Sequence, residues 1–245
     1  MLENLRILQV NLNKSITATE STLQLAVELQ ANIIAVQEPW LAPTSNNDNY
    51  AQARSTIHQA FFQMWPIADP RIRPRVMFYI SRTLAAEAYL LENFQKDPDA
   101  MAIVVKGDNY QINLINVYNQ TNAEGTKTIP RVLLGTQLPL YSVLVLDCNE
   151  HHPRWDPLSP TTSPGAQQFI DWFENQDLEL LNTLGVGTFF RPHLSREPVL
   201  DLSLVTPDLA SKATDWQITT ETGSDHYGIL FSIQTSNNQV DNPAN

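Results

Sequence analysis

The sequence predicts one domain rich in short β-strands with a few helices, either a large β-sandwich or an α/β domain. A length of 245 residues is ordinary for a single large β-sandwich or α/β domain. Most apolar runs are short and rich in β-branched residues, as in Val143-Leu144-Val145-Leu146, which is typical of buried strands. No repeat or interior linker divides these runs. We therefore expect a single domain over residues 1–234 and a polar, disordered tail over 235–245.

The first half of the chain contains runs that predict strands around one helix. The expected elements are, in order, a strand at 5–11, a helix over about 20–30 with Thr19 as its N-cap, a strand at 32–38 that ends before Pro39, a polar loop at 41–60 and a strand at 76–80. The helix carries Leu23, Ala26 and Val27 near one stripe, so that this face should be buried.

The second half predicts a hairpin, two helices and a series of strands. Gly107-Asp108-Asn109 is a turn signal between two apolar runs, and Pro164 opens a segment with apolar residues at helical spacing. The expected elements are strands at 101–105 and 110–118, a short helix at 129–137, a strand at 143–147, a helix after Pro164, and strands at 178–181, 188–190, 199–206, 216–219 and 228–233.

The chain is acidic, with 15 Lys plus Arg against 26 Asp plus Glu and a net charge of −11. This balance argues against a generic polyanion binder, because binding by counterion release needs clustered cations. It leaves open an enzyme that brings a phosphate to a metal held by carboxylates. The single cysteine, Cys148, excludes an internal disulfide and fits a reducing compartment. With no recognisable signal peptide or membrane span, we expect an intracellular protein.

Polar side chains stand at the ends of several expected strands. Asp147 and Asn149 leave the run Val143–Leu146 on the same side, where Asp147 is suited to take a proton from water and Asn149 to donate to a developing oxyanion. On this stretch alone, a turn in which both side chains bond backbone amides is the better interpretation. The whole set favours an active site at a sheet edge; its members are Asn11, Glu38, Tyr118, Asp147, Asn149, Asp201, Asp225 and His226.

Six stretches in this order carry a resemblance to a known family. They are Val10-Asn11-Leu12-Asn13, Gln37-Glu38-Pro39-Trp40, Asn116-Val117-Tyr118-Asn119, the run from Asp147-Cys148-Asn149 through Pro153-Arg154-Trp155, Leu200-Asp201-Leu202-Ser203-Leu204-Val205, and Ser224-Asp225-His226-Tyr227. The chain resembles the endonuclease/exonuclease/phosphatase superfamily, specifically the apurinic-type endonuclease domain of LINE-like (non-LTR) retrotransposons. The resemblance implies a DNase I-like fold with four layers, α/β/β/α.

The resemblance also implies a role for each strand-end residue. It assigns Glu38 to a divalent metal, Mg²⁺ or alternatively Mn²⁺, with Asn11 and Asp225 nearby. Asp147 would orient or deprotonate the attacking water, and Tyr118 would contact the phosphate or position the nucleophile. Asn149 and His226 would hold the scissile phosphate, while Asp201 would hydrogen-bond His226. Convergence requires the side chains of Asp147 and His226 to lie within about 10 Å of each other, so that one phosphate bridges them.

Four positions depart from the pattern of the family. Leu146 stands where Gly is usual, Cys148 replaces the usual Phe, and Asp156 occupies a common Gly position. Asn13 stands where many repair relatives carry an acid, which is expected to weaken metal binding. Because no departure removes a catalytic group, we expect activity.

Two arginine-containing segments are candidates for contacts with double-stranded DNA. Arg71, Arg73 and Arg75 form the densest positive charge in the chain, for which a solvated surface is an equally good interpretation. Arg191 and Arg196 lie in the expected loop between strands at 188–190 and 199–206. In related retroelement enzymes the corresponding loop probes the DNA groove. The alternative is an ordinary mobile loop in which Arg196 pairs with Glu197.

Three functions remain open on the sequence alone. The first is a metal-dependent endonuclease that nicks target DNA and leaves a 3′ hydroxyl for reverse transcription, acting in the nucleus. Its partner would be the reverse transcriptase domain of the same element if the chain is an excised domain, and the protein itself is expected to be a monomer. The second is a small-molecule or lipid phosphatase of the same superfamily. The third is a non-catalytic interaction module derived from such an enzyme.

Overall fold

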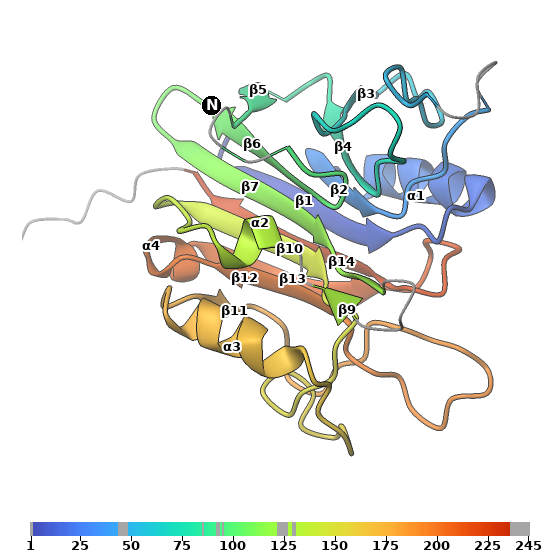
Figure 1. Ribbon diagram of the computed structural model, residues 1–245. Coiled ribbons are helices and arrows are strands. Elements are labelled where there is room, and N and C mark those ends of the chain that lie inside the picture. Colours follow the sequence, from blue (N-terminus) through green and yellow to red (C-terminus); the bar gives the residue numbers. More distant parts are fainter. Residues whose placement is uncertain are drawn as a thin grey trace, which may run out of the picture.

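Two β-sheets stacked face to face form the centre of the protein, with helices on the outer surfaces (Figure 1). The computed structural model describes residues 2–43, 49–84, 86–91, 94, 96–121, 127–128 and 131–235. Apart from Thr235, the tail expected at 235–245 lies outside these residues. Among the described helices, none is long and apolar enough to cross a membrane.

The first sheet contains six strands in the order β13-β14-β1-β2-β4-β3. β1 and β2 run parallel, and the other neighbours are antiparallel. The bounds are Asn4–Asn11 for β1, Ile33–Gln37 for β2, Phe61–Met64 for β3, Val76–Ser81 for β4, Ala213–Thr219 for β13 and Gly228–Gln234 for β14.

The second sheet repeats this plan in the order β11-β12-β10-β7-β6-β5, with β10 and β7 as its parallel pair. The bounds are Glu87–Leu90 for β5, Ala100–Lys106 for β6, Gln111–Tyr118 for β7, Ser142–Asp147 for β10, Glu179–Leu180 for β11 and Asp201–Val205 for β12. A separate pair joins β8 (Gln120–Thr121) to β9 (Lys127–Thr128). The carboxyl ends of β1, β2, β7 and β10 meet at one end of the sandwich (Figure 1).

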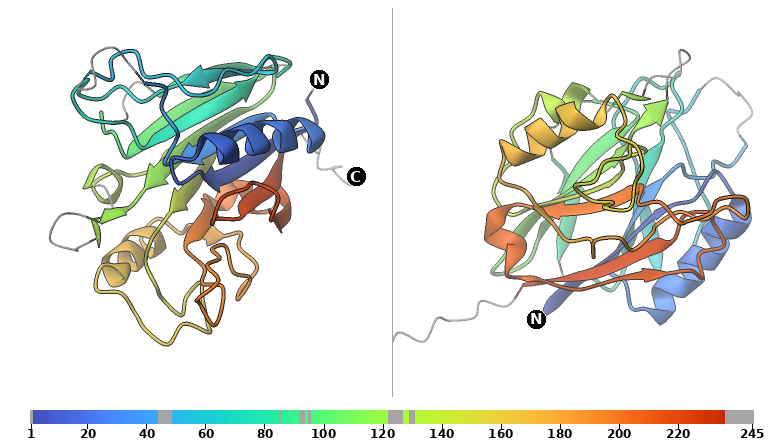
Figure 2. Two further views of the ribbon diagram at one scale, coloured as in Figure 1. Left: turned by 90° about the vertical axis from the view of Figure 1, so that its right-hand side faces the viewer. Right: turned by 90° about the horizontal axis from the view of Figure 1, so that it is seen from below.

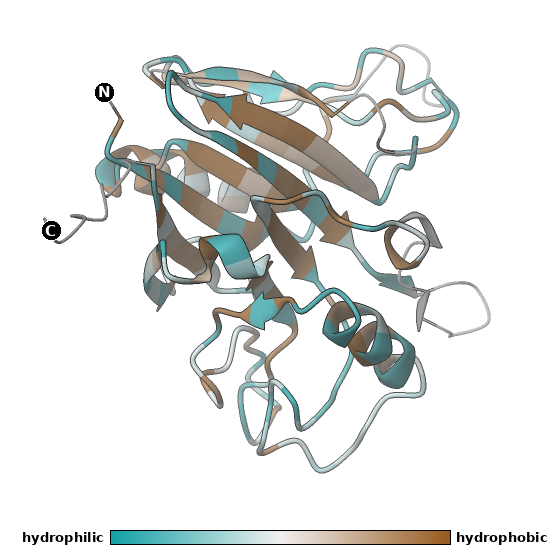
Figure 3. Ribbon diagram, turned by 90° about the vertical axis from the view of Figure 1, so that its left-hand side faces the viewer, coloured by the Kyte–Doolittle hydropathy of each residue, from teal (hydrophilic) through white to brown (hydrophobic). Residues whose placement is uncertain are grey.

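Alternation along the strands divides the apolar residues into three cores. On β1, Leu5 and Ile7 face the other sheet, whereas Leu8 and Val10 face the helix α1 (Ile16–Glu28). The outer surface of the second sheet packs against α3 (Ala166–Glu174) through Phe169 and its neighbours. The two helices lie on opposite sides of the stacked sheets (Figure 2), and hydrophobic residues concentrate in the strands (Figure 3). This confirms the predicted four-layer α/β/β/α fold.

Several predicted elements need correction. Helix α1 begins earlier than expected, because the side chain of Ser15 caps it by accepting from the backbone N–H of Ala18. Thr19 is instead a buried residue within the helix. The segment 188–190 is not a strand; it makes one isolated bridge, between Phe189 and His226.

The remaining differences concern short elements. The expected helix at 129–137 is the four-residue α2 (Arg131–Leu134), and residues 129–130 lie outside the described part of the chain. The predictions missed the strands β3 and β5 and the short helix α4 (Pro207–Ala210). Strand β12 begins at Asp201 rather than at Val199. Elements as short as β3, β5 and α4 contain too few residues for the spacing of apolar side chains to identify them.

Candidate active site

The inward-facing side chains of the central strands change from apolar to polar near the carboxyl ends. On β1, Leu5 and Ile7 are followed by Gln9 and Asn11, and the same alternation on β10 places Asp147 after buried valines. Hydrogen bonds between the sheets satisfy these buried groups: Gln9 Nε2 donates to the carbonyl of Leu146 over 3.0 Å. The sheets are therefore fixed to each other directly beneath the candidate site.

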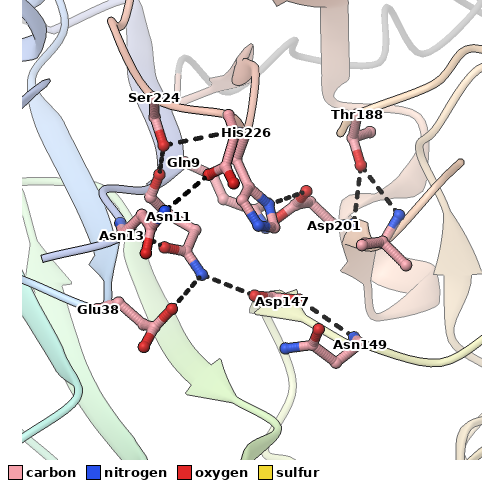
Figure 4. A network of polar contacts seen from close by, with 12 residues as sticks. Gln9, Asn11, Asn13, Glu38, Asp147, Asn149, Thr188, Asp201, Ser224 and His226 are labelled. Atoms are coloured by element: carbon pink, nitrogen blue, oxygen red, sulfur yellow. Dashed lines mark hydrogen bonds and ion pairs between the residues drawn. The ribbon is translucent and has the colours of Figure 1, made fainter. Parts of the chain in front are cut away.

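Asn11 connects two carboxylates that come from different sheets (Figure 4). Its Nδ2 donates to Asp147 Oδ2 over 2.7 Å and to Glu38 Oε2 over 3.4 Å. The backbone N–H of Asn13 donates to Asn11 Oδ1 over 2.8 Å, which turns the amide nitrogen toward the carboxylates. Asp147 also accepts from the backbone N–H of Asn149 over 3.1 Å. In this orientation, the amide nitrogen of Asn11 faces the two carboxylates, and its oxygen faces the backbone of Asn13.

His226 forms a buried pair with Asp201 beside Asp147. Asp201 Oδ2 lies 2.9 Å from His226 Nδ1, and ligand atoms of Asp147, Asp201 and His226 all lie within 4.8 Å of one another. The ring of Phe189 packs edge-on against the imidazole with centroids 4.7 Å apart. Asp147 and His226 thus meet the expected limit of about 10 Å for residues that one phosphate bridges.

Burial and mutual charge determine the protonation of this cluster. Burial alone would lower the pKa of His226, but the carboxylates of Asp201 and Asp147 outweigh it and raise that pKa to about 9. Burial raises the pKa of Asp147 well above its ordinary value, although the positive charge of His226 opposes the rise. At neutral pH, the site therefore combines an imidazolium with a carboxyl group poised to exchange a proton.

A strained backbone holds Glu38 at the rim. Residue Glu38 has φ of 45°, and Asn13 and Lys14 across from it have φ of 47° and 57°. Left-handed conformations of non-glycine residues cost about 1–3 kcal/mol each and gather at functional sites. Lys14 Nζ lies 2.5 Å from Glu38 Oε1. The pKa of Tyr118 is raised by burial and then by the Glu38 carboxylate, which places that hydroxyl near the same rim.

Sequence comparison covers the second half of this arrangement. A family described as endonuclease-reverse transcriptase matches residues 112–230, which include Tyr118, Asp147, Asn149, Asp201, Asp225 and His226. Over these residues, just under half of the chain, the protein is similar to this family. No curated protein sequence matches it significantly.

Several solved structures share the fold. The endonuclease domain of TRAS1, a telomere-specific non-LTR retrotransposon, superposes with a TM-score of 0.74 and 17% identity over 95% of this chain and 99% of its own. The AP endonuclease LMAP from Leishmania major superposes with a TM-score of 0.70 and 11% identity, covering 96% of this chain and 89% of its own. The 3′-5′ exonuclease NExo from Neisseria meningitidis superposes with a TM-score of 0.59 and 14% identity, covering 94% of this chain and 99% of its own.

The departures from the superfamily pattern have local explanations. Leu146 and Cys148 point into the core beneath α3, away from Asp147. Asn13 Nδ2 donates to Asp225 Oδ1 over 3.3 Å. Asp156 is buried and accepts from Arg196 Nη1 over 2.9 and 2.7 Å. Two of the four departures therefore supply contacts of their own at the rim and in the adjacent loop.

Two sets of side chains are candidates for a divalent metal. The buried trio of Asp147, Asp201 and His226 has suitable spacing, but its carboxylates raise the pKa of His226 and so favour the imidazolium form, which does not bind a metal. Glu38, with Asp147 beyond Asn11, supplies the hard oxygen atoms that Mg²⁺ prefers. The geometry therefore fits a metal at Glu38 better than one within the trio.

Asp225 and Asn149 lie less directly in the cluster. Asp225 Oδ2 accepts from Arg191 Nη2 over 3.2 Å, and none of the hydrogen bonds among the described residues joins it to Glu38. Asn149 has φ of 52° and its Nδ2 donates to the carbonyl of Asn119 over 3.1 Å. Both positions lie at the rim, where Asp225 beside the metal and Asn149 at the phosphate stay predictions.

The five arginines assigned to DNA have partners within the protein. Arg71 pairs with Asp69, Arg75 with Asp99, and Arg73 donates to the carbonyl of Pro39. Arg191 pairs with Asp225, and Arg196 pairs with Asp156 rather than with Glu197. The rim therefore has less free positive charge than the sequence indicates.

Sequence reasoning missed several residues that build the site. Ser224 Oγ donates to the carbonyl of Asn11 over 2.7 Å and accepts from the N–H of His226. Thr188 Oγ1 accepts from the N–H of Asp201 over 3.0 Å. Ser224 lies within the Ser-Asp-His stretch quoted above, so its place near the site could have been found. No sequence pattern around Lys14 or Thr188 indicates that either residue contacts the site.

Proposed function

We propose that the protein is a metal-dependent DNA endonuclease that nicks one strand by phosphodiester hydrolysis and leaves a 3′ hydroxyl. The observation that carries this proposal is the buried trio, in which the Asp201–His226 pair lies within 4.8 Å of Asp147. Hydrolysis of a phosphodiester needs a base for the attacking water and a cation beside the phosphate oxygens. Asp147 and His226 supply these two groups from opposite sheets.

Asp147 is suited to accept the proton of the attacking water. Its burial raises the pKa, so that the carboxylate holds a proton more strongly than an exposed aspartate. Asn11 and the N–H of Asn149 fix its two oxygens by hydrogen bonds of 2.7 and 3.1 Å. A base that is held in place loses little freedom when the substrate arrives.

His226 is suited to hold the phosphate. Asp201 keeps its Nδ1 bonded and keeps the ring charged, which leaves Nε2–H to donate to a phosphate oxygen. Glu38, with Asn11 and Asp225 nearby, would hold Mg²⁺ or Mn²⁺, which would neutralise charge on the phosphate oxygens. Tyr118 and Asn149 lie at the same rim and contact the phosphate in this proposal.

A plasmid assay tests the proposal. Purified protein with Mg²⁺ is expected to convert supercoiled plasmid to open circles, and EDTA is expected to stop the conversion. DNA polymerase should extend the nicks without prior end repair, because they carry 3′ hydroxyls. A protein that leaves plasmid intact but releases phosphate from small or lipid phosphoesters would replace this function with a phosphatase, which the net charge of −11 favours. Absence of both reactions would support a non-catalytic module.

The retroelement context belongs to the same proposal. A nick that ends in a 3′ hydroxyl is a primer for reverse transcription, so the partner is the reverse transcriptase of the same element and the place of action is the nucleus. The family match to an endonuclease-reverse transcriptase supports this context. A primer-extension assay on nicked target DNA, with the element's RNA and reverse transcriptase, would test it.

A further inference from the structure

Lys14 brings a positive charge onto the carboxylate that the proposed function assigns to the metal. Its Nζ lies 2.5 Å from Glu38 Oε1, with exposed side-chain fractions of 50% for Lys14 and 12% for Glu38. The other oxygen, Glu38 Oε2, accepts from Asn11 Nδ2 over 3.4 Å. Both carboxylate oxygens therefore already have a donor.

The backbone fixes this contact. The N–H of Lys14 donates to the carbonyl of Glu38 over 2.9 Å, and both residues have left-handed φ angles. The N–H of Leu12 likewise donates to the carbonyl of Gln37 over 2.9 Å, which extends the pairing of β1 with β2 to the turn. The Lys14 side chain thus starts next to Glu38 whatever rotamer it adopts.

We infer that Lys14 is an internal counter-cation of Glu38, which a divalent cation displaces when it binds; this rests on the proposed function. Attraction between Lys14 and Glu38 stabilises the metal-free state, and repulsion between the ammonium and the incoming cation opposes binding. The lysine therefore lowers the affinity of the site for the metal. It also keeps the rim from carrying an uncompensated carboxylate while the metal is absent.

The test measures metal binding without DNA. Calorimetric titration with Mn²⁺ should give a dissociation constant about two- to fivefold lower for Lys14→Met than for the wild type, which is the scale of a partly exposed ion pair. The rise in thermal midpoint on adding Mn²⁺ should also be larger in Lys14→Met. An equal or weaker affinity in this variant would overturn the inference.

Two variants control for charge and for general effects. Lys14→Arg keeps the positive charge and should bind Mn²⁺ as the wild type does. Lys212 lies at the opposite end of the sandwich, over the ring of Tyr141 before β10, so Lys212→Met changes the net charge equally without touching Glu38. Equal tightening in Lys212→Met would assign the effect to net charge and overturn the inference.

The outcome is separable from that of the proposed function. Suppose that the wild type nicks plasmid and that its Mn²⁺ affinity equals that of Lys14→Met. The proposed role of Lys14 is then wrong, and the endonuclease function still holds. Suppose instead that the wild type does not nick plasmid but that Lys14→Met binds Mn²⁺ more tightly. The endonuclease function is then wrong, and the displacement of Lys14 by the cation still holds.

Discussion

His226 is buried and yet charged, which is costly unless neighbouring groups compensate it. It is only 6% exposed, and Asp201 and Asp147 supply the compensation. Removing the ring should therefore remove the cation that acts on the phosphate. We expect His226→Ala or Glu38→Ala to lower the nicking rate by ~10²–10³, with unchanged circular dichroism. Near wild-type turnover in folded His226→Ala would contradict the mechanism.

The protonation of His226 depends on Asp201. In Asp201→Asn, burial still lowers the pKa of His226, but the carboxylate that raises it most is gone. The imidazolium, and with it the activity, should then be lost at lower pH than in the wild type. Profiles of kcat/KM over about pH 6 to 10 measure this shift of the alkaline limb. Asp171→Asn on the outer helix α3 is the matched control. If the alkaline limb of the profile stays at the same pH in Asp201→Asn, activity does not depend on the charge of His226.

At the scale of elements, α1 is joined to the site through its first turn. Ser15 accepts from Ala18 N–H at the N-terminus of the helix and directly follows Lys14. Ser15→Ala should lower the free energy of unfolding by about 0.5–2 kcal/mol, because the N-cap bond is lost. Urea unfolding measures the change, with exposed Ser195→Ala as the control. Equal stability of Ser15→Ala and the wild type would show that this cap contributes nothing.

The elements also show what the sequence can predict. Central strands such as β10 carry a continuous apolar run that ends on a polar residue, so both the strand and the position of Asp147 at its end were predictable. Pairings across the sandwich, such as Gln9 with Leu146, depend on how two sheets stack and have no local signal. For the same reason, the Arg191–Asp225 and Arg196–Asp156 pairs could not be read from the sequence.

For the whole molecule, the question is how an acidic protein would engage the DNA of the proposed function. Four of the five arginines assigned to DNA pair with acids of the protein itself, and the fifth donates to a carbonyl, so these arginines must exchange their partners before they can neutralise phosphates. Sequence preference is then expected to depend on shape and local contacts more than on bulk charge. The loop after Phe190 is the best candidate, because Phe190 N–H donates to the carbonyl of Asp225 beside the site.

The tip of this loop can be changed without breaking its anchors. Arg191 holds Asp225 and Arg196 holds the buried Asp156, so replacing only His193 and Leu194 by Gly-Ser leaves both ion pairs in place. If the tip probes the groove, the replacement should move the nick positions on a long duplex while total nicking of plasmid stays near that of the wild type. Sequencing the ends of nicked strands measures the positions.

A second variant separates the tip from its anchor. Arg191→Ala removes the contact with Asp225 but keeps His193 and Leu194, and its nick positions should resemble those of the wild type if the tip makes the selection. Leu194 is 39% exposed at this tip, and apolar side chains of this kind can insert into a minor groove. An unchanged cleavage pattern in the Gly-Ser variant would show that the loop only closes the rim around His226, and that selection lies elsewhere on the surface.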